Sequence, residues 1–307
     1  MKKKEFRFNT PILFLVFNRF EEAKRVFKEI KRIKPKLLFI ASDGPRINKP
    51  GEKEIVEKIR TYLLKNITWR CKVKKLFRDE NLGCGRAVSE AINWYFDNVK
   101  EGIILEDDCL PSQSFFIFCQ EMLKIYRKDE RVASIFGMNA IPWKGKESYK
   151  FHIAIGLWGW ASWRRAWKEI YFPEQEHMKG TNPKKYIREI FPNIVERINF
   201  GKKYLDHVNG RVDTWEFPWQ LGIIRRGKLN IIPRENLISN IGLGEGFTNT
   251  QSNTIDKRFF IIPKDEMYPP YISPKKVKRD EILRWRYVFR DYRRVVLKRL
   301  NNFFRII

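Results

Sequence analysis

The chain has 307 residues, of which 43% are hydrophobic, and it carries 62 Lys and Arg residues against 36 Asp and Glu residues. With 24 Phe and 10 Trp, the hydrophobic content is enough for a sizeable core and excludes a globally disordered protein. The formal net charge of +26 favours polyanionic partners, such as nucleic acid, anionic lipid or phosphorylated small molecules, without choosing among them.

The first residues of the chain and its cysteines indicate the cellular compartment of the protein. The apolar run 11–17 follows a lysine-rich start, but it is short and has no small-residue cleavage site, so we interpret it as a strand and not as a signal peptide. No run approaches the ~18 apolar residues that a membrane span requires. No C-x-x-C pair and no zinc spacing occurs among the cysteines, which are Cys71, Cys84, Cys109 and Cys119. We therefore expect reduced thiols and a cytoplasmic protein.

The first half of the sequence alternates between short apolar runs and hydrophobic residues at helical spacing. The runs predict strands at Pro11–Phe17, Leu37–Ala41, Val73–Phe77, Gly102–Leu105 and Val132–Phe136. Between them, helices are predicted at 23–33, 52–65, 87–96 and 114–127. This order predicts an α/β fold with a mainly parallel sheet flanked by helices. After about residue 138 the regular alternation stops.

Polar residues follow each of the first four predicted strands, at 18–19, 42–45, 78–81 and 106–108. In parallel sheets the ligand lies beyond the carboxyl ends of the strands. The last of these segments is the acidic triplet Glu106-Asp107-Asp108. Carboxylate oxygens suit Mg²⁺ or Mn²⁺, which commonly keep open positions for phosphates. An acidic turn or helix start exposed to solvent is the alternative.

Two further segments offer ligand contacts. The loop 81–86, Asn-Leu-Gly-Cys-Gly-Arg, places backbone N–H groups beside Arg86, which suits an anion, although a tight turn is the alternative. Residues 156–167 hold four tryptophans, among them Trp158 and Trp160, which could stack on sugar rings or belong to the core. The three histidines are isolated from one another, and we assign none a catalytic role.

Six motifs together resemble those of GT-A-fold glycosyltransferases, which are Rossmann-like: PILFLVFNR (11–19), SDGPR (42–46), NLGCGRAVSEAINWYF (81–96), EDDCLP (106–111), WGWASWRRAW (158–167) and PRENLISNIGLGEGFTNT (233–250). The resemblance covers about residues 10–260. It is greatest to the bacterial haemolytic-protein-like nucleotide-diphospho-sugar transferases and more distant to N-acetylglucosaminyltransferase I, which shares an E-D-D metal motif.

The resemblance implies roles for individual residues. The nucleotide and the donor sugar would contact Asn18, Arg19, Asp43, Arg86, Glu106 and Asp107. Within this set, Asp43 would contact the base, Arg86 would lie near the diphosphate or ribose, and Glu106 and Asp107 would contact the ribose and donor sugar. Asp108 would be the direct ligand of Mn²⁺ or Mg²⁺. Relatives commonly end the last motif in A-T-H-T, whereas this chain has Asn249 in place of that histidine.

Relatives of this type are inverting enzymes, which need one carboxylate to activate the acceptor hydroxyl. The candidates are Glu216 and Asp213, in a segment that resembles the aromatic-flanked acidic segment of the relatives. Trp215 and Trp219 would desolvate Glu216 and raise its pKa. If 212–217 is extended, the two carboxylates point to opposite faces and only one can reach the donor. The alternative is that Glu216 caps a helix or pairs with a nearby arginine.

The sequence therefore predicts a metal-dependent, inverting glycosyltransferase that uses a nucleoside-diphosphate sugar and a glycan or glycolipid acceptor. Residues 1–262 would form the GT-A domain, with a nucleotide-sugar half (1–137) and an acceptor half (138–262). Two alternatives are a nucleotidyltransferase that makes a sugar nucleotide and a basic nucleic-acid-binding protein. The first would normally show a glycine-rich first loop, and the second a known binding motif; neither occurs, and we expect no nucleic-acid partner.

Residues 263–307 would form a basic tail. From 275 to 307 there are twelve Lys and Arg residues and three Asp and Glu residues, a net charge of 12 − 3 = +9. An apolar stripe recurs there every three or four residues, at Trp285, Phe289, Tyr292, Val296, Leu300, Phe303 and Ile307. This pattern is typical of an amphipathic helix on an anionic membrane surface, which would place the protein at the inner face of the plasma membrane. Docking of this helix on the body of the protein or on a partner is the alternative.

Overall fold

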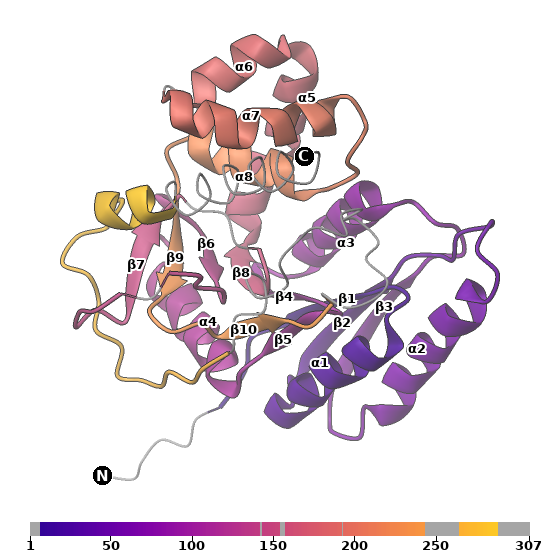
Figure 1. Cartoon of the computed structure of the whole chain (residues 1–307). Helices are drawn as coiled ribbons and strands as arrows, with labels where there is room; N and C mark the ends of the chain where they lie inside the picture. Colours follow the sequence, from indigo (N-terminus) through magenta and orange to yellow (C-terminus); the bar gives the residue numbers. More distant parts are fainter. Residues whose placement is uncertain (1–6, 142, 154–156, 192, 243–263, 288–307) are drawn as a thin grey trace, which may run out of the picture.

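The computed structural model describes residues 7–141, 143–153, 157–191, 193–242 and 264–287. Its centre is an eight-stranded sheet with the order β3-β2-β1-β4-β8-β6-β9-β7 (Figure 1). The strands are β1 (Ile12–Val16), β2 (Leu37–Ser42), β3 (Lys72–Phe77), β4 (Glu101–Glu106), β6 (Val132–Phe136), β7 (Tyr149–His152), β8 (Trp160–Trp163) and β9 (Leu229–Pro233). A separate antiparallel pair joins β5 (Cys109–Pro111) to β10 (Ile238–Asn240).

Strands β1 to β4 are parallel, and β6 and β9 run in the same direction. Strand β8 lies between β4 and β6 and is antiparallel to both, and β7 is antiparallel to β9. The helices that cover the first half are α1 (Phe20–Ile33), α2 (Glu52–Asn66), α3 (Cys84–Asn98) and α4 (Gln113–Ile125). The predicted α/β class, with a mainly parallel sheet flanked by helices, is therefore confirmed.

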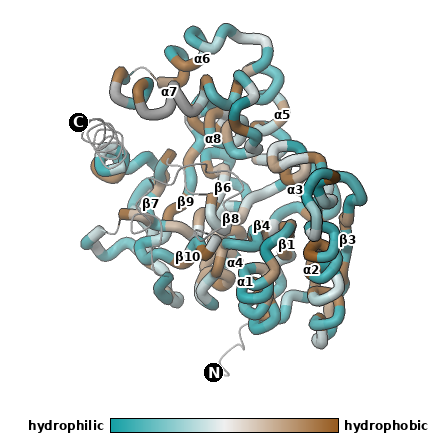
Figure 2. Tube along the Cα trace, turned by 45° about the vertical axis from the view of Figure 1, so that its right-hand side comes forward, coloured by the Kyte–Doolittle hydropathy of each residue, from teal (hydrophilic) through white to brown (hydrophobic). Residues whose placement is uncertain are grey.

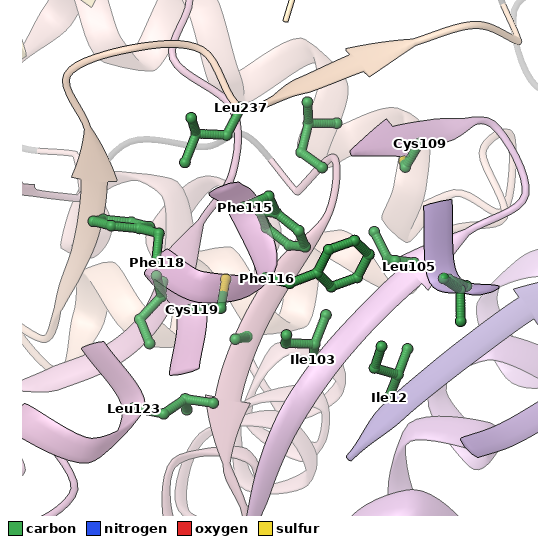
Figure 3. Packing of buried hydrophobic residues seen from close by; sticks show 14 of the residues in the cluster. Ile12, Ile103, Leu105, Cys109, Phe115, Phe116, Phe118, Cys119, Leu123 and Leu237 are labelled. Carbon is green, nitrogen blue, oxygen red and sulfur yellow. The ribbon is translucent and has the colours of Figure 1, made fainter. Parts of the chain in front are cut away.

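The central strands are apolar along their whole length because both faces of the sheet are covered. In β1, Ile12 and Phe14 face a core shared with α1, α2 and α4, whereas Leu13 and Leu15 face a second core shared with α3. Figure 3 shows Ile12 and Ile103 of neighbouring strands facing Phe116 of α4. Figure 2 shows that α1 is largely hydrophilic, as expected of a helix that contacts the core through one stripe.

The second half of the chain contains α5 (Arg164–Gly180), α6 (Pro183–Ile190), α7 (Ile194–Val208) and α8 (Glu216–Arg225). These four helices lie together beside the sheet (Figure 1). Four tryptophans join α5 and α8 to β8: the Trp160 ring stacks on Trp215 at 5.5 Å, lies 5.5 Å from Trp219 and lies 6.3 Å from Trp167 of α5, and all four are buried. Most of the tryptophan-rich segment is therefore core.

The segment 264–287 packs against the body of the protein. Met267 and Leu283 are buried, and Lys150 of β7 forms an ion pair with Asp280 at 2.7 Å. Arg284, in the helical stretch 281–287, pairs with the buried Glu196 of α7 at 2.8 Å. The rest of the predicted tail helix, 288–307, lies outside the described residues. Within the described part of the chain, no helix has the length and apolar character to cross a membrane.

Candidate active site at the carboxyl ends of the parallel strands

A cavity of about 500 Å³ lies beyond the carboxyl ends of β1, β2 and β4. Its volume falls in the range of about 300–1,000 Å³ that is common for ligand sites. The residues after these strands and the start of α3 form one side, and Trp158, Asp213 and Glu216 come from the second half of the chain. The predicted position of the ligand crevice agrees with this cavity.

The acidic triplet ends β4 and lines the cavity together with Arg19, which follows β1. The Arg19 guanidinium contacts two of the three carboxylates through one nitrogen: Nη1 lies 2.8 Å from Asp108 Oδ2 and 3.3 Å from Asp107 Oδ1. Asp107 also accepts a hydrogen bond from the backbone N–H of Phe17 at 3.0 Å. Pairing of β1 with β4, which sets Leu15 opposite Glu106, brings these groups together.

The carboxylates of this cluster destabilise one another in the ionised form. Burial, with added repulsion from Asp108, Glu216 and Asp107, raises the pKa of Glu106 well above its usual value. Burial also raises the pKa of Asp107 to about 6, although the nearby Arg19 charge opposes the shift. One guanidinium therefore does not balance the negative charge at the end of β4, and a cation of higher charge there would relieve more of the repulsion.

The carboxylates fit a hard divalent ion as part of its coordination shell. Asp107 and Asp108 already converge on one cationic group, the Arg19 guanidinium, so their geometry accommodates positive charge. Gly242 permits this arrangement, because a Cβ at that position would lie 2.6 Å from Asp108 Oδ2. Among the described residues, no group of three or more His, Cys, Asp or Glu side chains could hold a metal by itself. Phosphate oxygens and water would have to complete the shell of a Mg²⁺ or Mn²⁺ ion.

Asp43, after β2, joins two loops at the edge of the cavity. Its carboxylate accepts hydrogen bonds from the backbone N–H groups of Gly44 at 3.0 Å and Leu82 at 3.1 Å, and from Asn81 Nδ2 at 3.0 Å. Burial raises the pKa of Asp43 in spite of these hydrogen bonds, which lower it. Asp43 therefore orders the loop before α3 and still lines the cavity.

Both candidate bases line the cavity, and the condition under which only one of them would reach the donor, an extended segment 212–217, is not met. The segment is not extended up to residue 217, because α8 begins at Glu216 and the backbone turns there. Asp213 Oδ1 accepts a hydrogen bond from the backbone N–H of Gly85 at 3.0 Å, at the start of α3. The charge of Glu216 instead acts on Glu106, which places Glu216 beside the acidic triplet.

Two predicted contact residues do not line the cavity. Trp160 is 1% exposed and belongs to the tryptophan core, whereas Trp158 lines the cavity. The side chain of Arg86 is 69% exposed and pairs with Glu90 at 2.7 Å, one turn further along α3. Side chains four residues apart lie on the same face of a helix, so Arg86 can reach Glu90, and this pair lies outside the residues that line the cavity.

The remaining predicted residues are either at the cavity or outside the described part. Asn18, Arg19, Glu106, Asp107 and Asp108 all line it. Asn249 lies outside the described residues. Arg46, Arg78, Asn240 and Gly242 are among the lining residues that were not predicted as site residues. Arg78 could have been included, because it follows a predicted strand. The other three depend on a loop course and on the short strand β10, which carry little sequence signal.

Comparisons with known proteins identify no close relative. No family model and no curated protein matches the chain. Among solved structures, the mannosyltransferase PcManGT from Pyrobaculum calidifontis, in complex with GDP-Man and Mn²⁺, is 10% identical, over 71% of this chain and 69% of that chain, with a TM-score of 0.37. HddC from Yersinia pseudotuberculosis is 9% identical over 51% of this chain and 77% of that chain, with a TM-score of 0.31. TarS 1–349 from S. aureus is 8% identical over 52% of this chain and 48% of that chain, with a TM-score of 0.34. Such distant likenesses carry no argument about activity, which has to be argued from the site.

Proposed function

We propose that the protein is a GT-A-type glycosyltransferase that transfers a sugar from a nucleoside-diphosphate sugar to a hydroxyl of a glycan or glycolipid, with inversion and with the help of Mn²⁺ or Mg²⁺. The observation that carries the proposal is the cavity itself. It brings together Asp107 and Asp108, whose carboxylates both contact the Arg19 guanidinium, and a carboxylate from the other half of the chain, Glu216.

The donor would lie across the ends of β1, β2 and β4, with its nucleoside toward Asp43 and its diphosphate toward Asp108. Arg19 and Arg46 are among the cationic side chains that line the cavity, and Arg46 is held by hydrogen bonds to the buried Glu52. Asn18 is fixed by the same carboxylate at 2.9 Å. A preorganised cationic wall of this kind suits a diphosphate.

Displacement of a nucleoside diphosphate from the anomeric carbon places negative charge on the leaving phosphate. A divalent ion bound by Asp108 would supply Lewis-acid stabilisation of that charge. Arg19 and Arg46 would add donors to phosphate oxygens, and the apolar wall formed by Ala87 and Val88 would keep water from the reacting bond.

The acceptor hydroxyl needs a base as it attacks the anomeric carbon from the face opposite the leaving diphosphate. Glu216 is our candidate, because Asp213 already accepts a hydrogen bond from α3. Trp158 lines the same cavity and offers an aromatic face for a sugar ring. The proton of the hydroxyl would move to a carboxylate oxygen of Glu216 as the new glycosidic bond forms, and the diphosphate would leave from the opposite face.

The proposal includes an anionic membrane surface as the place where a glycolipid acceptor is met. Support comes from the start of the basic tail: Lys275, Lys276 and Lys278 line a second cavity of about 350 Å³ together with Lys150. Each lysine close to anionic lipid contributes ~1 kcal/mol to membrane binding. Exposed apolar side chains follow directly, with Ile282 at 75% and Trp285 at 36% exposure.

A panel of sugar nucleotides, each tested with Mn²⁺ by thermal shift and by slow donor hydrolysis, tests the function. A donor at a hundredfold excess over its Kd should stabilise the native state by ~2.7 kcal/mol. Hydrolysis should stop in excess EDTA and in Asp108→Ala, whose thermal unfolding should remain cooperative. If no sugar nucleotide shifts the unfolding temperature, the proposed function is wrong. Full activity in EDTA would reject the metal alone.

A further inference from the structure

The Arg19 guanidinium is bonded to the carboxylate that the proposed function assigns to the metal. Arg19 Nη1 lies 2.8 Å from Asp108 Oδ2, and the two side chains are 23% and 13% exposed. The second oxygen of Asp108, Oδ1, accepts a contact from Cys109 Sγ at 3.3 Å. Both oxygens of Asp108 therefore have partners within the protein.

A divalent ion that takes Oδ2 of Asp108 has to compete with this guanidinium. Two cations held a few ångströms apart in a half-buried site repel each other strongly, so Arg19 and the ion exclude each other from Asp108. Asp107 does not offer an equivalent alternative for Arg19, because its Oδ2 accepts the Phe17 N–H at 3.0 Å and its Oδ1 lies at the longer distance of 3.3 Å. Arg19 therefore loses its shortest carboxylate contact when the ion binds.

The donor's diphosphate provides an anion for Arg19. A guanidinium pairs with phosphate oxygens in a forked geometry, and Arg19 lines the same cavity as Asp108. We propose that Arg19 is a positioning residue that occupies the metal's place on Asp108 until a donor arrives, and that it then moves to the diphosphate. This inference rests on the proposed function. It implies that binding of the metal and binding of the nucleotide depend on each other.

Reciprocal coupling follows from this exchange. Metal alone binds weakly because it must displace the Arg19 guanidinium from Asp108. Nucleotide alone binds weakly because Arg19 is held by Asp108. When both bind, the metal takes Asp108 and the diphosphate takes Arg19, so the ion pair between the two residues is broken only once. Each ligand therefore raises the affinity of the other by the same factor. The negative charge of Asp107 and Asp108 is also paired with a cation before and after the exchange, first with Arg19 and then with the metal ion.

The test measures Mn²⁺ affinity without any nucleotide, by electron paramagnetic resonance of free Mn²⁺, for wild type and Arg19→Gln. Loss of the competing guanidinium should tighten Mn²⁺ binding at least tenfold. Arg46→Gln is the matched control: Arg46 lines the same cavity and the substitution removes the same charge, but Arg46 pairs with Glu52 and not with Asp108. We expect its Mn²⁺ affinity to change less than threefold. Equal or weaker Mn²⁺ binding by Arg19→Gln would overturn the inference, as would equal tightening in both variants.

A second measurement addresses the coupling and does not require Arg19→Gln to be fully stable. Calorimetric titration with UDP and with GDP, each with and without Mn²⁺, should show in wild type that Mn²⁺ raises affinity for one of them. Arg19→Lys keeps a positive charge but loses the fork, so this synergy should fall at least fivefold. Undiminished synergy in Arg19→Lys would contradict the exchange. If wild type binds neither of these nucleotides nor any sugar nucleotide of the thermal-shift panel, the proposed function fails, whereas the Mn²⁺ comparison still decides the competition for Asp108.

Discussion

The Asp213 carboxylate accepts a hydrogen bond from the backbone N–H of Gly85 at 3.0 Å, across 128 residues of sequence. The approach is close, because a Cβ at Gly85 would lie 2.2 Å from Asp213 Oδ1. Asp213 thus acts as a cap for α3, where a carboxylate is stabilised by the positive end of the helix. This contact joins the two halves of the chain at the cavity and leaves Glu216 as the better candidate for the base.

Substitution of the two carboxylates should have different consequences. In Glu216→Gln, turnover should fall by a factor of ~10², the lower limit for a lost general base, with unchanged donor binding and stability. In Asp213→Ala, the free energy of unfolding should fall by ~0.5–2 kcal/mol, as for other lost caps. Turnover numbers and urea unfolding of both variants check these expectations. An active Glu216→Gln together with an inactive but folded Asp213→Asn would assign the base to Asp213.

The first half of the fold could be predicted because its strands are buried on both faces. Such strands appear in the sequence as continuous apolar runs, and β1, β2, β4 and β6 were found in this way within two residues of their ends. Strand β8 was not found. It has four residues, and its place between β4 and β6 depends on pairing with strands that are distant in the sequence.

The site could be predicted where it depends on strand ends and not where it depends on loops. Asp43 and Asp108 follow strands, so the topology of a parallel sheet brings them to one edge. The contact of Asp213 with Gly85 is different, because it depends on how α8 begins and on the packing of Trp215. Local sequence patterns do not encode such long-range contacts. The four-residue spacing of Arg86 and Glu90 fits an ion pair along a helix, and Arg86 also suits an anion at the loop, so the local sequence does not decide between them.

Substitution of Trp158 should affect activity, whereas substitution of Trp160 should affect stability. Trp160 is 1% exposed and packs against Trp215 and Trp219, so Trp160→Ala should lower the free energy of unfolding by ~3–5 kcal/mol through the cavity it leaves. Trp158 lines the active-site cavity, and Trp158→Ala should raise the KM for a sugar substrate with less loss of stability. Urea unfolding and steady-state kinetics measure both effects. The assignment of Trp158 fails if its substitution affects only stability.

Acid should destabilise the helical part of the protein through Glu174 of α5. This side chain is fully buried and accepts hydrogen bonds from Tyr186 Oη at 2.7 Å and Arg225 Nε at 2.8 Å, and it also contacts Arg226. Burial alone would raise its pKa, but the hydrogen bonds from these three residues outweigh burial and lower it. Because the folded-state pKa is the lower one, the stabilisation is present above the unfolded-state pKa of ~4.3 and is lost as the pH falls through the folded-state value.

Glu174→Gln tests this linkage. At pH 7 the variant should be less stable than wild type by ~3–5 kcal/mol, because two arginines lose a buried partner. The difference should shrink as the pH falls from the unfolded-state pKa of ~4.3 through the lower folded-state pKa, where Glu174 of the wild type takes up its proton. Glu169→Gln in the same helix is the matched control: its side chain is 45% exposed and pairs with Lys228, so the loss should stay below ~1 kcal/mol. A difference that does not depend on pH would reject the linkage.

The basic tail should anchor the protein to anionic membranes. Removal of residues 275–307 would also remove Asp280, Leu283 and Arg284, which contact the body of the protein, so the cleaner truncation ends at Tyr287. It deletes five arginines and one lysine of the predicted amphipathic helix, and each is worth ~1 kcal/mol near anionic lipid. Co-sedimentation with phosphatidylglycerol-containing vesicles should therefore fall at least tenfold, and residual binding should weaken in high salt.

Vesicles of neutral lipid are the control. If the truncated protein binds anionic vesicles as well as the full chain does, the tail is not the anchor. A lower unfolding temperature of the truncated protein would then favour the alternative, in which the helix docks on the body.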